Sequence, residues 1–209
     1  MRRPGKILCI GQNYRAHIAE LKGEVPPDPV IFIKPATALI ANGEDILVPP
    51  GLGRVDYEGE LAVVIGKKCK GVGRSEALGC VGALAVFNDV TARDMQSRAR
   101  KAGMAWDMAK GMDTFAPMSE PNDFKDVPDV HGLSIQTRLN GNLKQNGNTA
   151  DMMYPVEELI AYITRYMTLE AGDVIATGTP EGVGPIAPGD VVEVEISGVG
   201  KLRNPVRSA

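Results

Sequence analysis

The amino-acid sequence predicts an α+β protein built around a strand-rich roll or barrel. Glycine and proline, 24 and 15 of the 209 residues, are spread along the chain, so we expect many short segments separated by turns. Runs rich in valine and isoleucine outnumber amphipathic helical segments. These helical segments do not alternate regularly with the strands, which disfavours a doubly wound parallel sheet.

Strands are expected where turn residues bound a short apolar run. In chain order, these runs are residues 6–10, 30–34, 57–66, 81–90, 174–176 and 191–196. Residues 46–50 form an extended run that two prolines close. Residues 133–139 and the Asn-Gly-Asn at 140–142 are typical of the first arm and turn of a hairpin.

Helices are expected between these strands. A short helix from Asn13 to about Leu21 takes Asn13 as its N-cap, because an asparagine oxygen can accept from first-turn amides. A second begins near residue 75, and a third spans 92–101. The clearest helix, 156–167, follows a proline and has two glutamates in its first turn. Its apolar face comprises Val156, Leu159, Ile160, Ile163 and Met167.

Size and charge limit the classes of function. We expect one domain over residues 1–209, a length that suffices for one core. A formal net charge of −3 without basic runs argues against nucleic acid as a partner. The apolar runs are too short to cross a membrane bilayer, and no secretory signal is visible. Three widely spaced cysteines, Cys9, Cys69 and Cys80, indicate buried thiols in the cytoplasm or an equivalent reducing space.

Two carboxylates, Glu58 and Glu60, lie at the start of the clearest strand. Residues i and i+2 of a strand face the same side, so these side chains should project together and repel unless they are neutralised. On spacing alone, exposure of both at a sheet edge is the commoner solution. The alternative is a hard divalent cation held by carboxylate oxygens.

Asp89 shifts the balance toward a cation. It stands at the end of an apolar strand, where an unpaired carboxylate is costly. A helix N-cap or an ion pair with Arg93 would also explain it. Three carboxylates with water molecules would suit octahedral Mg²⁺ or Mn²⁺.

His17 and Glu20 are three residues apart, so on a helical turn their side chains are neighbours. A carboxylate bonded to imidazole raises its basicity and fixes its tautomer, as a general base requires. A surface pair on a short amphipathic helix explains the spacing equally well and is commoner. The other histidine, His131, is expected in a solvated turn.

Two further signals carry little weight alone. Residues 177–184 form a glycine-rich turn that could present backbone amides to an anion. This turn lacks the Lys-Ser/Thr ending of a phosphate-binding loop. Lys110 lies in an apolar neighbourhood, and most lysines are exposed.

Taken together, six stretches resemble motifs of the fumarylacetoacetate hydrolase superfamily, in order and near the expected spacing. They are IGQNYRAHIAEL, FIKPATALI, DYEGELAVVIG, FNDVTARDMQ, AKGMDTFAP and IATGTPEGVG. The similarity runs from about Ile7 to Pro205 and is to the short members, a group that includes acylpyruvate hydrolases and oxaloacetate decarboxylases.

The resemblance implies a mixed β-roll or sandwich with a few peripheral helices, a homodimer, bound Mg²⁺ or Mn²⁺, and a small 2-oxo acid substrate. It makes residues 11–24 a lid segment. The implied metal ligands are Glu58, Glu60 and Asp89. The implied catalytic residues are His17 and Glu20, as a water-activating dyad, and Lys110. The implied substrate contacts are Arg93, Gln96 and Thr179.

The activity expected from this resemblance is magnesium-dependent C–C hydrolysis of an acylpyruvate-type 2,4-dioxo acid, of the acetylpyruvate or fumarylpyruvate class. The same site could serve oxaloacetate decarboxylation or tautomerisation, or a 2-hydroxyhepta-2,4-diene-1,7-dioate-type isomerisation, because all three need a stabilised enolate. A complete His–Glu dyad favours hydrolysis. A metal- or metabolite-binding protein without catalysis is the alternative from another class.

Overall fold

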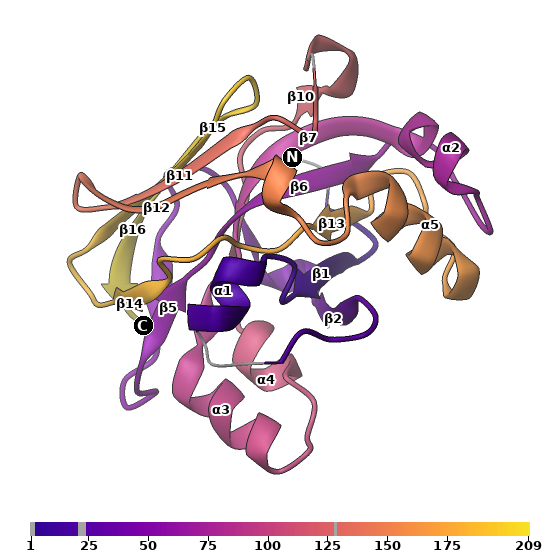
Figure 1. The fold of residues 1–209 in the computed structure, drawn as a ribbon. Coiled ribbons are helices and arrows are strands. Elements are labelled where there is room, and N and C mark those ends of the chain that lie inside the picture. The colour runs from indigo at the N-terminus through magenta and orange to yellow at the C-terminus, as the bar shows by residue number, and fades with distance from the viewer. Residues whose placement is uncertain (1–2, 21–23, 128) are drawn as a thin grey trace.

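The computed structural model describes residues 3–20, 24–127 and 129–209. Strands dominate these ranges and form four sheets, with short helices at the periphery (Figure 1). The expected strand-rich α+β fold is therefore confirmed. No helix in the described part of the chain is both long and apolar enough to span a membrane. The three cysteines are buried and unbridged, as expected.

The largest sheet has the strand order β10-β7-β6-β13-β1-β2. Its strands are β1 (Ile7–Gly11), β2 (Val30–Lys34), β6 (Gly59–Ile65), β7 (Val81–Asn88), β10 (Asn122–Asp123) and β13 (Val174–Ala176). All neighbours are antiparallel except β1 and β13, which pair in parallel with Ile7 opposite Val174. Strands far apart in sequence thus meet at the centre of this sheet.

A five-stranded sheet packs against the largest one, with the order β12-β11-β15-β16-β4. Its strands are β4 (Ile46–Val48), β11 (Ser134–Leu139), β12 (Asn142–Asn148), β15 (Val191–Ile196) and β16 (Gly200–Ser208). Strand β11 lies on β6, and both β15 and β16 lie on β7. Buried Leu61, Leu84, Ile135 and Val194 fill the layer between the two sheets.

Two small sheets and the helices complete the fold. The strands are β3 (Leu39–Ile40) with β9 (Ala116–Pro117), and β14 (Gly184–Ile186) with β5 (Val55–Tyr57) and β8 (Thr91–Ala92). The helices are α1 (Arg15–Glu20), α2 (Arg74–Ala77), α3 (Arg93–Lys101), α4 (Asp107–Lys110) and α5 (Val156–Tyr166). Figure 1 shows α3 and α4 at the lower end of the molecule with α1 above them, and α2 and α5 on the right-hand side.

The structure confirms most expected elements. The turn Asn140–Gly141 has positive φ at both residues, 52° and 80°, as a two-residue hairpin requires. Helix α5 buries the expected apolar face, although it ends at Tyr166, one residue before Met167. Leu21, the expected end of the first helix, and residues 21–23 of the expected lid lie outside the described residues.

Two expectations were wrong. Residues 57–66 are not one strand: Tyr57 pairs with Gly184 in a small sheet, whereas Gly59 pairs with Asn88 in the largest one. Asn13 does not cap α1. Its side-chain amide donates to the carbonyls of Tyr154 and Thr177, and its oxygen accepts from the Tyr154 amide. Asn13 therefore links the residues just before α1 to two segments that are distant in sequence, at Tyr154 and at Thr177.

Candidate active site

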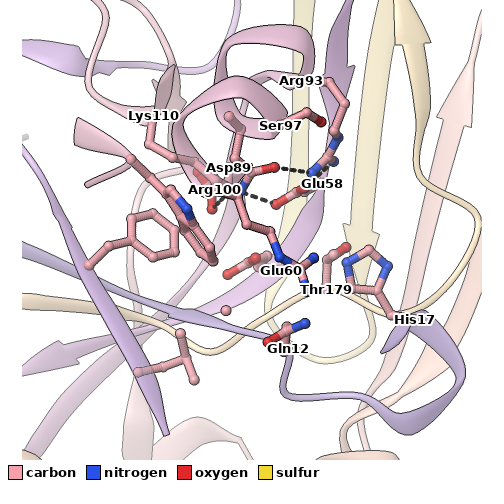
Figure 2. Close-up of a pocket in the computed structure, with 15 residues that line it drawn as sticks. Gln12, His17, Glu58, Glu60, Asp89, Arg93, Ser97, Arg100, Lys110 and Thr179 are labelled. Atoms are coloured by element: carbon pink, nitrogen blue, oxygen red, sulfur yellow. Dashed lines mark hydrogen bonds and ion pairs between the residues drawn. The ribbon is translucent and has the colours of Figure 1, made fainter. Parts of the chain in front are cut away.

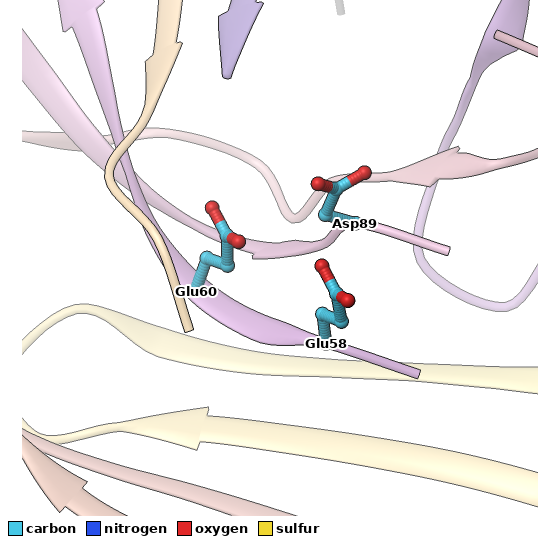
Figure 3. A group of neighbouring side chains, drawn as sticks. All are labelled: Glu58, Glu60 and Asp89. Atoms are coloured by element: carbon cyan, nitrogen blue, oxygen red, sulfur yellow. The ribbon is translucent and has the colours of Figure 1, made fainter. Parts of the chain in front are cut away.

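Three carboxylates meet beside the largest sheet. Glu58 lies between β5 and β6, Glu60 lies on β6, and Asp89 follows β7. Because Gly59 pairs with Asn88, the chain places Asp89 next to both glutamates. Figure 3 shows the three side chains as neighbours, with Glu58 and Glu60 extending to the same side of the chain. One ligand oxygen from each lies within 4.8 Å of the others, and all three residues are buried. Exposure at a sheet edge, the commoner expectation, is therefore wrong.

Gly59 allows this approach of the carboxylates. A Cβ at this position would lie 2.2 Å from the Thr137 hydroxyl on β11, so a side chain would push the sheets apart. The Glu58 amide donates to the Asn88 side chain, and the Asp89 amide donates to the Glu58 carbonyl. These bonds hold the break between β5 and β6 in one shape.

Two cationic side chains neutralise part of the cluster. Lys110 Nζ donates to Glu58 Oε2 at 2.8 Å and to Asp89 Oδ2 at 2.6 Å. Arg93 donates to the other Glu58 oxygen and to Asp56. Burial alone would raise the pKa of Glu58, but Lys110 and Arg93 outweigh it and hold that pKa below its usual range. Glu58 is therefore ionised.

Glu60 has no such partner. Its Oε2 accepts from the Gly178 amide at 2.8 Å, and no lysine or arginine of the described residues lies within ion-pair distance. Burial, followed by the charges of Asp89 and Glu58, raises the pKa of Glu60 well above its usual range. Among the three carboxylates of the cluster, Glu60 is the one without an ion-pair partner in the described part of the chain.

Lys34, which is fully buried, stands behind Asp89. Its Nζ lies 2.7 Å from Asp89 Oδ1 but donates its hydrogens to the carbonyls of Val90, Lys110 and Phe115, at 2.9, 2.5 and 2.6 Å. Asp89 Oδ1, which is buried, therefore has the Lys34 ammonium as its ion-pair partner. Burial lowers the pKa of Lys34.

These residues fit a divalent metal ion. The cluster supplies hard oxygen donors from three buried carboxylates, one from each lying within 4.8 Å of the others. A cation there would also supply the positive charge that Glu60 lacks. Glu58, Glu60 and Asp89, the expected ligands, are thus brought together.

The His17–Glu20 pair forms on α1. His17 Nδ1 lies 3.2 Å from Glu20 Oε2, and Glu20 also accepts from the Gly182 amide. The imidazole is only 6 % exposed and borders the same cavity as the carboxylates, so it is not half of a surface pair. With Nδ1 donating to Glu20, Nε2 is left as the acceptor.

One cavity of about 150 Å³ joins these groups (Figure 2). Eight of the nine expected site residues border it: His17, Glu58, Glu60, Asp89, Arg93, Gln96, Lys110 and Thr179. The ninth, Glu20, does not border the cavity but is hydrogen-bonded to His17 Nδ1. The hydroxyl of Thr179 is already used inside the protein, since it donates to the Gly59 carbonyl and accepts from Gln145.

Other residues that border the cavity were missed by sequence reasoning. They include Gln12, Phe32, Ser97, Arg100 and Trp106. Lys110 Nζ lies 4.8 Å from the centre of the Phe32 ring, which contacts Trp106 edge to face. Ser97 and Arg100 could have been found, because they lie on the same helical face as Arg93 and Gln96.

Comparisons with known proteins identify the family of this chain. The model of the fumarylacetoacetate (FAA) hydrolase C-terminal family matches residues 6–207. The mitochondrial oxaloacetate tautomerase FAHD1 of Bos taurus is 40 % identical over 193 residues, 92 % of this chain and 87 % of that protein.

Solved structures are similar over nearly the whole chain. The 5-carboxymethyl-2-hydroxymuconate delta-isomerase of Mycobacterium smegmatis is 41 % identical, with a TM-score of 0.89 over 99 % of this chain and 80 % of that one. The fumarylpyruvate hydrolase of Pseudomonas aeruginosa, in complex with Mn²⁺ and pyruvate, is 31 % identical, with a TM-score of 0.93 over 98 % and 90 %. The chain belongs to the fumarylacetoacetate hydrolase family.

Proposed function

We propose that the protein is a metal-dependent enzyme that hydrolyses a C–C bond in an acylpyruvate-type 2,4-dioxo acid to give pyruvate and a carboxylic acid. The observation that carries this proposal is one small cavity bordered by a three-carboxylate cluster and by a histidine oriented by Glu20. The fumarylpyruvate hydrolase crystallised with Mn²⁺ and pyruvate, which is similar over 98 % of the chain, supports the same class.

The metal we propose is Mg²⁺, with Mn²⁺ as the alternative, held by Glu58, Glu60 and Asp89. When bound there, the ion would supply Lewis-acid stabilisation of negative charge on the 2-oxo acid end of the substrate. Arg93 and Gln96, which are bonded to each other at 2.7 Å on α3, would orient that end.

His17 and Lys110 would carry the proton transfer and the charge that develops in the reaction. His17 Nε2 takes a proton from water while Glu20 holds the other ring nitrogen. The resulting hydroxide attacks the distal carbonyl. Lys110 uses two hydrogens on Glu58 and Asp89, so its third can donate to the oxyanion. The C–C bond then breaks, and its electron pair passes to the pyruvate fragment, which takes up a proton.

A second candidate is the keto–enol tautomerisation of oxaloacetate. The relatedness to oxaloacetate tautomerase FAHD1, at 40 % identity, favours it. This reaction needs proton transfer at the carbon beside the 2-oxo group but no attacking water. His17 could move that proton in the same position. The 41 % identity to a delta-isomerase favours a third reaction of this kind, proton transfer in an unsaturated 2-oxo acid.

The test is pyruvate release from acetylpyruvate in Mg²⁺ and in EDTA, with oxaloacetate consumption and enol absorbance followed in parallel. Rapid, EDTA-sensitive pyruvate release from acetylpyruvate is the expected result. Turnover of oxaloacetate alone would replace hydrolysis by the second candidate. Inactivity on both would overturn both and leave the isomerase reaction to be assayed.

We also propose a homodimer that works in the cytoplasm or an equivalent reducing compartment. The buried, unbridged cysteines suit such a compartment. Light scattering on a sizing column tests the dimer, which would have twice the 22.3 kDa mass of the chain.

A further inference from the structure

Gln145 is a fully buried side chain that connects the two large sheets next to the carboxylate cluster. It lies on β12, does not border the cavity, and takes no part in the proposed reaction. Its Oε1 accepts from the Gly59 amide at 3.0 Å, and its Nε2 donates to the Thr179 hydroxyl at 2.7 Å. Gln145 therefore contacts, from outside the cavity, the glycine between two expected metal ligands.

These bonds are part of a closed ring. The Thr179 hydroxyl, which accepts from Gln145, donates in turn to the Gly59 carbonyl at 2.9 Å. The ring thus runs from the Gly59 amide through two side chains to the carbonyl of the same glycine. The second Nε2 hydrogen of Gln145 donates to the Pro180 carbonyl at 2.9 Å. The reverse orientation of the side-chain amide would set donor against donor and acceptor against acceptor, so one orientation satisfies every partner.

The ring holds the two peptide groups that separate Glu58 from Glu60. The Gly59 amide belongs to the peptide group after Glu58, and the Gly59 carbonyl belongs to the peptide group before Glu60. A peptide group is planar, so a bond to its N–H or C=O restrains the whole plane. Glycine lacks the Cβ that limits backbone dihedral angles, so this position has the most freedom to lose. The relative placement of the two glutamates therefore depends on the ring.

Strand β13 ends too early to hold this glycine. It pairs with β6 only as far as Ala62, and the next bond joins the Thr177 amide to the Leu61 carbonyl. Beyond that bond, the two side chains of the ring take the place of a neighbouring strand. Strand β12 packs directly on this part of the chain, since a Cβ on Gly147 would lie 2.5 Å from Pro180 Cβ.

We infer that Gln145 is a positioning residue, which holds Glu58 and Glu60 in the arrangement that a divalent metal ion requires. This inference rests on the metal site of the proposed function. The Gly178 amide, one residue before Thr179, bonds the Glu60 carboxylate, so the same segment restrains the backbone and the side chain of this ligand. Loss of a group that orients metal ligands typically lowers metal affinity about 10- to 100-fold.

A different explanation is that Gln145 only satisfies buried polar groups of the core. Asn204, on β16 of the same sheet, has that role elsewhere: it is buried, and its Nδ2 donates to the carbonyls of Ala41 and Glu44. None of these three residues borders the cavity. Asn204→Leu is therefore a matched control for Gln145→Met, because each change replaces a buried amide by an apolar side chain of similar size.

The experiment measures Mg²⁺ affinity by calorimetry and stability by urea unfolding on the same proteins. Both variants should be less stable than the wild type, so each is assayed at a temperature at which it is folded. We expect Gln145→Met to lower the affinity for Mg²⁺ about 10- to 100-fold and Asn204→Leu to leave it unchanged. Unchanged affinity in Gln145→Met, or an equal loss in Asn204→Leu, would overturn the inference.

A second variant tests the ring if Gln145→Met does not fold. Thr179→Val opens the same ring by removing one hydroxyl at nearly constant volume, and it should weaken Mg²⁺ binding to a similar extent. In the double variant the two losses should not add, because either change alone opens the ring. Additive losses, or wild-type affinity in Thr179→Val, would contradict the ring.

Metal binding does not depend on turnover, so the proposed reaction can fail separately. A wild type that binds Mg²⁺, loses affinity through Gln145→Met, and yet releases no pyruvate from acetylpyruvate would refute the reaction and leave the positioning role standing. A wild type that binds neither Mg²⁺ nor Mn²⁺ would overturn the inference together with the proposed metal site.

Discussion

Among the buried acids of the site, Glu60 is the residue whose charge state decides metal binding. Its pKa is raised by burial and by Asp89 and Glu58, so the metal-free protein keeps a proton there above the usual carboxyl range. A carboxylate must lose its proton to ligate a metal, so the proton and Mg²⁺ compete. Acidic conditions therefore oppose metal binding at this residue.

This competition gives a pH dependence of known sign. Affinity for Mg²⁺ should rise with pH, by up to about tenfold per unit, until the pH passes the raised pKa of Glu60. Calorimetry in buffers of different ionisation enthalpy counts the protons released. Glu60→Gln should release none and lose most of the affinity. Unchanged proton release in that variant would refute the assignment, and retained affinity would remove Glu60 from the ligands.

His17 provides a second prediction at the residue scale. His17→Gln should lower acetylpyruvate hydrolysis by about 10²- to 10⁴-fold and oxaloacetate decarboxylation far less, because only hydrolysis needs an activated water. Initial rates on both substrates measure this. His131→Gln is the control, since His131 is half-exposed and faces Glu157 instead of the cavity. Equal losses on both substrates would exclude a water-activating role.

The residues that sequence reasoning found and missed differ in physical terms. The Glu58–Glu60 and His17–Glu20 pairs have short sequence spacings that carry chemical meaning, and Asp89 stands at the end of an apolar run. Lys34 could not be found in this way, because its partners are mainly backbone carbonyls of distant segments. Backbone carbonyls leave no trace in residue type, so no sequence pattern indicates such a contact.

At the scale of elements, Lys34 joins three of them. It ends β2 and donates to carbonyls after β7, at the end of α4 and before β9. Each carbonyl is a buried group that would otherwise lack a donor. The same ammonium faces Asp89. Lys34 therefore holds the segments that carry a predicted metal ligand and Lys110.

Lys34→Met should accordingly destabilise the fold by about 3 kcal/mol or more, because it orphans buried carbonyls and leaves Asp89 with one cation fewer. Urea unfolding followed through Trp106 fluorescence measures it. Lys68→Met is the matched control: Lys68 is 69 % exposed and pairs with Glu170 at the surface, so its loss should be within about 0.5 kcal/mol. Equal stability of the two variants would contradict this role.

Helices and strands were predicted correctly where the apolar residues follow the pattern of a single element, either the helical repeat or a short continuous run. The apolar face of α5 and the run in β7 are such cases. The break at Glu58 was missed because the run from Leu61 onward outweighed Gly59, a residue that in a strand often marks a bulge or a close approach. In the structure, Tyr57 and Gly59 pair with different strands. Strand β16 was missed because it contains Pro205 and several charged residues, and a proline argues against a strand that is paired on both sides. In the structure, β16 pairs with both β15 and β4.

At the scale of the whole molecule, a bound metal should stabilise the fold. Glu58 and Glu60 lie just before and at the start of β6, and Asp89 lies directly after β7. A metal bound to all three carboxylates would therefore link two strands that separate on unfolding. Mg²⁺ at about 100 times its dissociation constant should contribute about 2.7 kcal/mol, a rise of several degrees in Tm. Thermal scans measure this, with Na⁺ at equal ionic strength as the control. A similar rise in Glu60→Gln would indicate a different site.

The fold class followed from local pattern, but the topology did not. Glycine and proline spacing indicated a strand-rich roll, and the resemblance supplied the architecture. Nothing local indicates that β1 lies between β2 and β13, since that pairing joins residues more than 160 positions apart. Turn residues indicate which consecutive strands form a hairpin. Parallel strands that are distant in sequence are not joined by such a turn, so no turn residue indicates their pairing.

The place of β1 between β2 and β13 has a consequence for synthesis of the protein. A ribosome that has made the first 150 residues has already made every carboxylate of the cluster, the dyad and Lys110. It has not yet made β13, which covers the open edge of β1, or Gly178 and Gly182, whose amides bond Glu60 and Glu20. The nascent chain therefore carries the reactive groups in an unassembled state. The last quarter of the chain completes this site, so a prematurely released fragment lacks the bonds from Gly178 and Gly182 that position Glu60 and Glu20.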